Sequence, residues 1–388
     1  MGACPAPAYR QGAARRDGGT VHRFVHRILR SFLISMAPLT LTAGSCLGEP
    51  QDAAKDKKMA EIRMRAEQGY PQQQIELAAA YLTGRGVPQD PVQAAYWYRK
   101  AADSGNPEAQ NQIGYFYQVG IGMPVDAERA VHWFQLASAG GMAWAKVNLG
   151  VSFLNGWGVG KNAAMAQQLF KAAVDKGAGL GATYLGIMNY FGKGVAVDKA
   201  AAERWFETGV KLHDPEAAFD LAILICNGDG ERHDVRRAVE LLRMSAGKGY
   251  VPAKHSLGLL LVNHPELAQT GQEARLALQE ASNGGNWKSS VLLGIMARDG
   301  KGGIADPAQA YYYFHLGGLQ GGVEGKHAVG PDVNALRRKL SGEQQAAAEA
   351  QAEAWFQQHP LPLMFLYREG ESDRNFPLLA VAAPAARP

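Results

Sequence analysis

The chain has 388 residues, of which 47% are hydrophobic and 20% are charged, proportions typical of a folded protein. Its formal net charge is +4, but residues 1–30 contribute +5 through six arginines and one aspartate, so residues 31–388 carry −1. A nearly neutral body argues against nucleic-acid binding through a basic surface, and the three cysteines are too few for a disulfide framework.

The N-terminal segment has the organisation of an export signal. Arg23, Arg27 and Arg30 precede a charge-free apolar run over residues 31–43, and small residues follow before Cys46. This order is that of the basic, apolar and small-residue regions of a secretory signal, and the run is too short to span a bilayer as a helix. We predict that residues 1–46 are an N-terminal extension and signal peptide, and that the mature protein is exported.

Cys46 is a candidate for lipidation. Residues 42–46 resemble the cleavage box of bacterial lipoproteins, although Ala43 stands where that box prefers leucine. Ordinary cleavage after Ser45 fits nearly as well, so both outcomes stay open. Lipidation at Cys46 would anchor the protein in a membrane, and Leu47 would favour the outer membrane; ordinary cleavage would leave a periplasmic protein.

A 36-residue period dominates the rest of the chain and holds for seven units. One column is always alanine, a second is leucine or isoleucine, and a third is glycine in six of the seven units. The three columns are Ala94, Ala130, Ala166, Ala202, Ala238, Ala274 and Ala310; Leu77, Ile113, Leu149, Leu185, Leu221, Leu257 and Leu293; and Gly105, Gly141, Gly177, His213, Gly249, Gly285 and Gly321. A fixed period of this length is typical of solenoids, whose units pack mainly on their neighbours.

Each unit is predicted to contain two antiparallel helices. In unit two, Asn106 and Pro107 begin the first helix, over residues 107–119, and a glycine loop ends it. The second helix begins at an N-cap residue and ends at the glycine of the third column. The expected N-caps are Asp90, Asp126, Asn162, Asp198, Asp234 and Asp306. Unit six lacks the glycine loop, and its residues 270–273 have a capping-box sequence instead.

A fourth column within the first helix holds only glycine or alanine: Ala78, Gly114, Gly150, Gly186, Ala222, Gly258 and Gly294. Glycine in a helix interior costs about 1 kcal/mol relative to alanine, so its repetition needs a physical reason. The simplest reason is close approach of the two helices of a unit.

These patterns predict an all-α fold, a right-handed α/α superhelical solenoid of seven 36-residue helix-turn-helix repeats with terminal capping helices. Residues 47–69 are assigned to a linker and an N-terminal capping half-repeat, and residues 70–325 to the repeats. Residues 326–360 are assigned to C-terminal capping helices, broken near Ser341 and Gly342. The Pro- and Ala-rich residues 361–388 are predicted to be a largely disordered tail.

The repeat sequence is similar to that of Sel1-like repeats, a subfamily of tetratricopeptide-type solenoids. The match is best in LTGRGVPQDPVQAAYWYRKAADSG, residues 82–105, and it extends over about residues 55–325. It weakens in unit five, where Gly230 and Glu231 replace Gly-Val, and in unit six. The resemblance implies a bacterial adaptor that holds partner proteins, and it does not name the partner.

Two sequence patterns resemble metal sites but lack the residues that such sites need, so no metal or cofactor is expected. Asn227, Asp229 and Glu231 have the spacing of a calcium loop, but Ala238 stands where that loop needs its bidentate glutamate. Cys226, His233 and Asp234 lie close in sequence, but Asp234 is explained as an N-cap and Cys226 as a buried core residue.

The candidate binding residues lie on a variable strip of the first helices, spaced i, i+4 and i+7. In tetratricopeptide-like solenoids this helix lines the concave side, so the strip is predicted to grip a partner segment. Its selected members are Gln112, Phe116, Asn148, Tyr184, Met188, Phe191 and Asp220. Partial burial between units is the alternative explanation, and it carries about equal weight.

Trp144 and Trp157 are two further candidates because each breaks its column. Other units carry charged residues at these positions, among them Glu108 and Arg85. An exposed aromatic ring at such a position would suit an interaction surface, whereas local packing between neighbouring units is the equally weighted alternative.

We therefore expect a non-enzymatic scaffold of the bacterial cell envelope that binds another envelope or periplasmic protein through its concave face. The alternative is a protein that binds peptidoglycan or an exopolysaccharide, with Trp144, Trp157 and Tyr190 stacking on sugar rings. Enzymatic activity is not expected, because the histidines show no metalloprotease motif or triad spacing. The paired cysteines of relatives linked to β-lactam hydrolysis are also missing.

Overall fold

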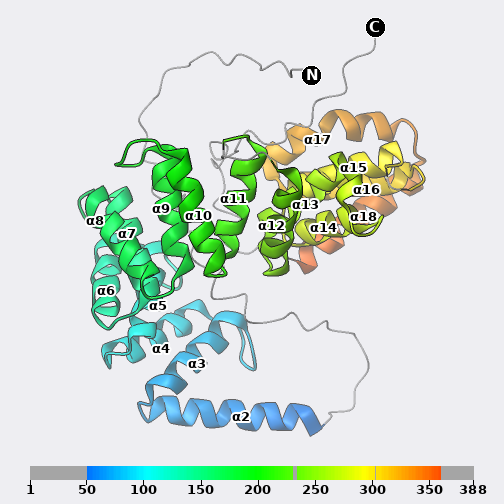
Figure 1. Cartoon of the computed structure of the whole chain (residues 1–388). Helices are drawn as coiled ribbons and strands as arrows, with labels where there is room; N and C mark the ends of the chain where they lie inside the picture. The colour runs from blue at the N-terminus through cyan, green and yellow to red at the C-terminus, as the bar shows by residue number, and fades with distance from the viewer. Residues whose placement is uncertain (1–49, 230–233, 302, 360–388) are drawn as a thin grey trace.

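The computed structural model describes residues 50–229, 234–301 and 303–359, and the regular elements within these ranges are all helical. Fourteen of the helices form seven pairs, one for each 36-residue unit. The pairs are α3 (Pro71–Thr83) with α4 (Pro91–Asp103), α5 (Pro107–Val119) with α6 (Ala127–Ala139), α7 (Ala143–Asn155) with α8 (Ala163–Val174), α9 (Gly179–Phe191) with α10 (Lys199–Lys211), α11 (Pro215–Cys226) with α12 (Val235–Gly247), α13 (Val251–Asn263) with α14 (Glu273–Asn283), and α15 (Trp287–Asp299) with α16 (Pro307–Gln320). Figure 1 shows them following one another in chain order, which confirms the predicted solenoid.

Additional helices lie at both ends of the stack. α2 (Pro50–Glu67) packs against α3, and α17 (Gly322–Arg337) and α18 (Gly342–Gln358) pack against α16. α17 begins several residues before the expected boundary at 326, because Gly321 and Gly322 make a tight connection directly after α16. The signal, lipidation and tail predictions for residues 1–46 and 361–388 lie outside the described residues. None of the described helices is both long and apolar enough to span a membrane.

The predicted N-caps of the second helices are confirmed. In each case an Asp or Asn side chain accepts a hydrogen bond from a backbone N–H in the first turn of its helix, so a donor that the helix cannot satisfy is paired. The capping residues are Asp90, Asp126, Asn162, Asp198, Asp234 and Asp306. Asn106 and Asp214 cap first helices in the same way.

The capping box predicted for unit six is not formed. α14 begins only at Glu273, its N-cap residue Gln272 makes no side-chain cap, and the short 3₁₀ helix η3 (Pro265–Leu267) occupies part of the connection. The Glu273 carboxylate instead accepts hydrogen bonds from Arg243 of α12 at 2.7 Å and from the backbone N–H of Gln269 at 2.6 Å. A long-range ion pair therefore replaces the local box.

The Gly/Ala column marks the closest approach within each pair, as predicted. A Cβ atom added to Gly186 would lie 2.4 Å from a ring carbon of Phe206, and one added to Gly150 would lie 2.6 Å from the ring of Phe170. Real Cβ atoms do not come so close to neighbouring carbons, so glycine lets the aromatic ring of the second helix pack directly on the backbone of the first.

Polar contacts also join neighbouring units. Arg237 of α12 and Glu207 of α10 form an ion pair at 2.7 Å between units five and four. Within unit five, the buried Ser245 hydroxyl of α12 donates to the carbonyl oxygen of Pro215 of α11 at 2.6 Å. One column of the second helices holds Trp97, Trp133, Trp205 and Tyr313. Trp133 and Tyr313 are buried, and Trp97 and Trp205 pack against the core while partly exposed.

Candidate functional site

The aromatic and thioether members of the predicted strip are buried. Phe116 is 1% exposed and meets Tyr98 edge-to-face with ring centroids 5.3 Å apart. Tyr184 and Met188 are fully buried, and the Tyr184 ring stacks on Phe170 at 5.1 Å. The expectation that these three side chains form an open binding surface is therefore corrected, because they fill the space between helices of the same and adjacent units.

The polar members of the strip are placed similarly. Asn148 of α7 is buried and donates its side-chain N–H to the side-chain Oδ1 of Asn111 of α5 at 2.8 Å, a contact between first helices of consecutive units. Asp220 is also buried, and Gln112 is half-buried. The contacts of Phe116, Asn148 and Tyr184 are thus made with the preceding unit, so these strip residues pack between units instead of facing solvent.

The two tryptophans that break their columns pack against the core. Trp157 is 4% exposed, and Trp144 is half-buried against the same cluster. The loop that carries Trp157 lies directly on the preceding unit: a Cβ atom at Gly158 would be 2.0 Å from the carbonyl oxygen of Ala127. These positions match the packing alternative rather than an exposed contact.

Phe191 is the most exposed member of the strip. It ends α9, is 50% exposed, and meets Tyr190 edge-to-face with ring centroids 4.8 Å apart. The Lys193 ammonium lies 5.7 Å from the centre of the Phe191 ring, within the range of a cation–π contact. We call Tyr190, Phe191 and Lys193 the α9 platform.

Asp229 holds the platform in place from the next unit. Both the Tyr190 hydroxyl and the Lys199 ammonium donate hydrogen bonds to the Asp229 carboxylate. Burial acts to raise the pKa of Asp229, but the hydrogen bonds from Lys199 and Tyr190 outweigh it, and the pKa lies below its ordinary value. Burial, together with the hydrogen bond to Asp229, raises the pKa of Tyr190 to about 12, so the phenol stays protonated and remains a donor.

The platform belongs to a longer edge of the solenoid. The loops that join the first to the second helix of each unit all lie on this edge, which we call the loop edge, and we include in it the last residue of each first helix. Large apolar side chains are exposed along it, namely Val125 at 52%, Phe191 at 50%, Val197 at 62% and Ile304 at 94%. Large apolar side chains are usually buried, and here they are exposed in three of the seven units.

Other groups that could suggest chemistry are structural. The sequence 245–248 has the Ser-x-x-Lys spacing of some acyl-transfer enzymes, so the expectation that this motif is absent from the chain is wrong. The Ser245 hydroxyl is buried and donates to the Pro215 carbonyl, while Lys248 lies exposed at the C-cap of α12. Burial raises the pKa of the Cys226 thiol to about 11, which disfavours a reactive thiolate. No three His, Cys, Asp or Glu residues of the described ranges are arranged to hold a metal ion.

Comparison with solved structures gives relatives of low sequence identity. A Sel1 repeat protein from Oxalobacter formigenes is 25% identical, with a TM-score of 0.48, over 60% of this chain and 97% of that chain. A protective antigen from uropathogenic Escherichia coli is 23% identical, with a TM-score of 0.40, over 80% of this chain and 74% of that chain. An immunity protein from Pseudomonas aeruginosa is 18% identical, with a TM-score of 0.35, over 56% and 88% of the two chains. No curated protein matched the chain.

The Sel1 repeat family model matches six of the seven units and over half of the chain. The matched residues are 74–106, 107–142, 145–177, 180–214, 215–250 and 288–322. Unit five matches despite its altered loop, whereas unit six, with its shortened second helix, is not matched. Proteins of this kind are in general interaction scaffolds rather than catalysts. The chain belongs to the Sel1 repeat family.

Proposed function

We propose that this protein is a non-enzymatic adaptor of the bacterial cell envelope that holds a partner protein along its loop edge, with the α9 platform as a principal contact. The observation that carries this proposal is the half-exposed Phe191 ring, supported by Tyr190 and Lys193 in a fixed arrangement. Aromatic side chains held rigidly at a surface are typical of the few residues that dominate binding energy at protein interfaces.

The spacing of the exposed apolar side chains favours a macromolecular partner. Val125, Val197 and Ile304 belong to units two, four and seven, so they lie along the stack rather than around one cavity. A solenoid presents such positions as an extended surface, which suits a partner segment that follows several units. This proposal moves the predicted contact from the concave face to the edge where the predicted strip ends.

The envelope assignment rests on the N-terminal sequence. The arginines of residues 23–30, the apolar run 31–43 and the small residues before Cys46 support export. If Cys46 is lipidated, the adaptor is tethered to a membrane; otherwise it works in the periplasm. Labelling with a radioactive fatty acid distinguishes these states, because a Cys46→Ser variant loses the label only in the first case.

The experiment that tests the adaptor function is crosslinking in cells followed by affinity capture of the tagged protein, with a matched pair of variants. Phe191→Ala is expected to reduce recovery of a stoichiometric partner by about tenfold or more, the effect of removing a dominant aromatic contact. Leu136→Ala, which removes an exposed apolar side chain near the C-terminal end of α6, at the opposite end of the helix from the loop edge, is the control. Phe116→Ala and Tyr184→Ala are unsuitable, because cavities at buried aromatic residues cost about 3–5 kcal/mol of stability.

Equal recovery of the partner by the parent and Phe191→Ala would refute the platform as the contact. Recovery of no protein, with sedimentation of the chain on purified peptidoglycan, would favour the polysaccharide function instead. In that case Phe191 and Tyr190 would be the rings to test for stacking on sugars, since Trp144 and Trp157 pack against the core.

A further inference from the structure

We propose that a cavity between α14 and the α15–α16 loop binds an extended segment of a partner protein that presents a carboxylate beside an aliphatic side chain. The cavity has a volume of about 540 Å³ and is open to solvent. This inference deepens the proposed adaptor function, on which it rests, by assigning a second contact on the loop edge and the chemistry of its occupant.

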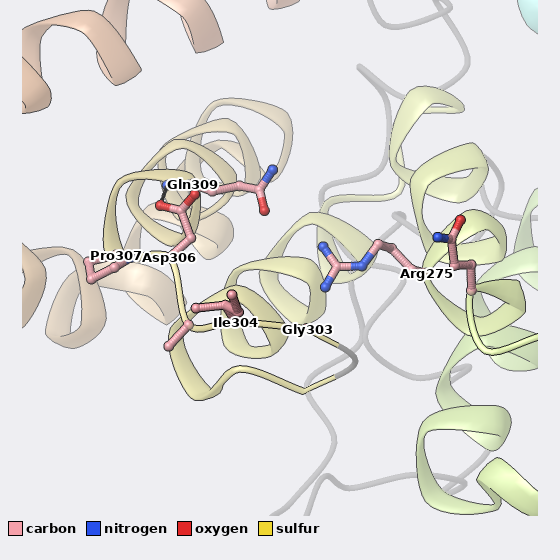
Figure 2. A pocket seen from close by; sticks show the side chains of 8 residues that line it. Arg275, Gly303, Ile304, Asp306, Pro307 and Gln309 are labelled. Atoms are coloured by element: carbon pink, nitrogen blue, oxygen red, sulfur yellow. Dashed lines mark hydrogen bonds between the residues drawn. The ribbon is translucent and has the colours of Figure 1, made fainter.

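The cavity exists because unit six departs from the repeat. In the other units the second helix begins directly at its Asp or Asn cap, whereas α14 begins only at Glu273, with Gln272 before it. The cavity beside this later start is bounded by Gln272 and Arg275 on one side and by Gly303, Ile304 and the start of α16 on the other. Figure 2 shows the Arg275 side chain pointing toward the loop that carries Gly303 and Ile304.

Arg275 is an unusual residue for its position. The same column holds Ala95, Val131 and Val239 in three other units and the polar residues Gln167 and Glu203 in two, but a basic residue in unit six alone. Arg275 also lies in the first turn of α14, where the helix dipole disfavours a positive charge. A positive charge that no other unit carries in this column, and that the helix dipole disfavours, points to function when no structural gain is evident.

The contacts of Arg275 leave its charge available to an anion. Within the described ranges its guanidinium donates one long hydrogen bond, to the Lys301 carbonyl oxygen at 3.4 Å, and pairs with no carboxylate. By contrast, Arg237, Arg243 and Arg298 all form ion pairs with nearby carboxylates. A guanidinium forms its strongest hydrogen bonds with carboxylates, which it can bind through two parallel N–H groups.

The remaining lining supplies apolar and polar contacts. Ile304 is 94% exposed, so covering it with an aliphatic side chain removes its apolar surface from water. Gln272 and Gln309 bring side-chain amides that can hydrogen-bond a peptide backbone. The Asp306 carboxylate accepts the N–H of Gln309 at 2.9 Å, so its charge is directed at the N-terminus of α16 and is offset there.

A titration with two blocked tetrapeptides tests this proposal on the full chain. The probes are N-acetylated, C-amidated alanine–leucine–glutamate–alanine and its glutamine counterpart, added to protein labelled at the isoleucine δ1 methyls and arginine Nε atoms. The glutamate peptide should shift the Ile304 methyl and Arg275 Nε signals saturably. The glutamine peptide should bind about tenfold or more weakly, because it cannot form the charged hydrogen bonds.

The Arg275→Gln variant provides the specificity test. Gln167 occupies the same column in unit three, so glutamine fits this helix position. Arg275→Gln should bind the glutamate peptide about as weakly as the parent protein binds the glutamine peptide. The control is Arg129→Gln, at an exposed arginine of unit two, which should bind the glutamate peptide as tightly as the parent does. The proposal is overturned if the two peptides bind with equal affinity, or if the glutamate peptide leaves the Ile304 methyl signal unshifted. Either outcome is independent of the partner recovery measured with Phe191→Ala.

Discussion

His213 is the one described non-glycine residue with a positive φ, at 59°. It occupies the helix-ending column in which Gly177 and Gly249 have φ values of 81° and 82°. A left-handed conformation costs a residue with a Cβ atom about 1–2 kcal/mol. Glycine avoids this strain, but it loses more conformational entropy on folding, which offsets part of the gain in stability. We expect His213→Gly to raise the free energy of unfolding by about 1 kcal/mol in urea denaturation.

The control for this change is Gly177→Ala. No atom lies within 4 Å of the Cβ position at Gly177, so alanine there meets no steric obstacle and tests the backbone conformation alone. It should lower the free energy of unfolding by about the same amount. Unchanged stability in both variants would show that the φ angle is not the source of strain.

His255 is expected to make stability depend on pH. Burial, and then the charge of Lys288, lower the pKa of His255 to about 4, and its Nδ1 lies 2.8 Å from the Ser289 hydroxyl oxygen. Because the unfolded histidine has a pKa near 6.5, the unfolded state binds the proton more readily between pH 6.5 and 4. The contribution of neutral His255 to the free energy of unfolding is complete above pH 6.5. It is lost as the pH falls toward 4, which lowers the free energy of unfolding by roughly 3 kcal/mol at most.

Urea midpoints measured at pH 7 and at pH 4.5 check the His255 prediction. His255→Gln keeps a polar side chain but cannot take up the proton, so its midpoint should fall less than that of the parent. An identical fall in the two proteins would assign the acid sensitivity to carboxylates such as Glu273, whose pKa is lowered by the Arg243 hydrogen bond.

At the scale of a helix pair, the Gly/Ala column predicts a coupling between two residues. Gly186→Ala would place a Cβ atom 2.4 Å from a Phe206 ring carbon and should destabilise the fold by about 1–3 kcal/mol. Unit five pairs Ala222 with Leu242 in the same columns, and both residues are buried. We therefore expect Phe206→Leu to relieve most of the cost of Gly186→Ala in a double-mutant cycle.

A coupling energy near zero in that cycle would contradict the close-packing explanation of the column. The loss from Gly186→Ala would then come from the helix backbone rather than from the ring that it meets. Both single variants and the double variant are measured by denaturant unfolding of the full chain, so that every arm of the cycle shares one reference state.

The elements themselves were largely predictable from the sequence, because each depends on local chemistry that recurs every 36 residues. Asp90 and Asp306 cap helices through a side-chain oxygen and a backbone N–H a few residues away, so a sequence pattern suffices. The Ser341 and Gln344 side chains form a capping box at the start of α18, and their spacing in the sequence could have predicted it. From the sequence, only a helix break is predicted at this point.

The candidate site was less predictable, because exposure depends on how consecutive units rotate against each other. Phe116 and Phe191 were assigned to one strip, but the first packs on Tyr98 and the second reaches solvent. The contact of Tyr190 with Asp229 joins residues 39 positions apart, and the ion pair of Arg243 with Glu273 joins residues 30 apart. Neither contact leaves a signal in the repeat columns.

At the scale of the whole molecule, α2 covers the N-terminal end of the stack and carries charged residues. Lys58 and Arg65 occupy the columns that hold the packing residues Ala94 and Ala101 in unit one, and both are exposed. Terminal repeats with a polar outer face keep solenoids from associating end to end. We expect a Lys58→Ala/Arg65→Ala variant to sediment faster than the parent at the same concentration in analytical ultracentrifugation.

The control for this variant removes the same charge from second helices inside the stack. Lys171 and Lys211 are both exposed, so Lys171→Ala/Lys211→Ala lowers the net charge equally without altering the terminal face. Faster sedimentation of both variants would indicate a general effect of charge on solubility, and faster sedimentation of neither would refute the capping role of α2.

The ion pair between Arg243 and Glu273 has a consequence for how such an array can change length. A unit whose second helix carries its own Asp cap is a self-contained cassette, which recombination can duplicate or delete without disturbing its neighbours. The start of α14 is instead secured by a side chain of α12. Units five and six should therefore be gained or lost only together. We expect viable duplications and deletions of single repeats to occur among units one to four.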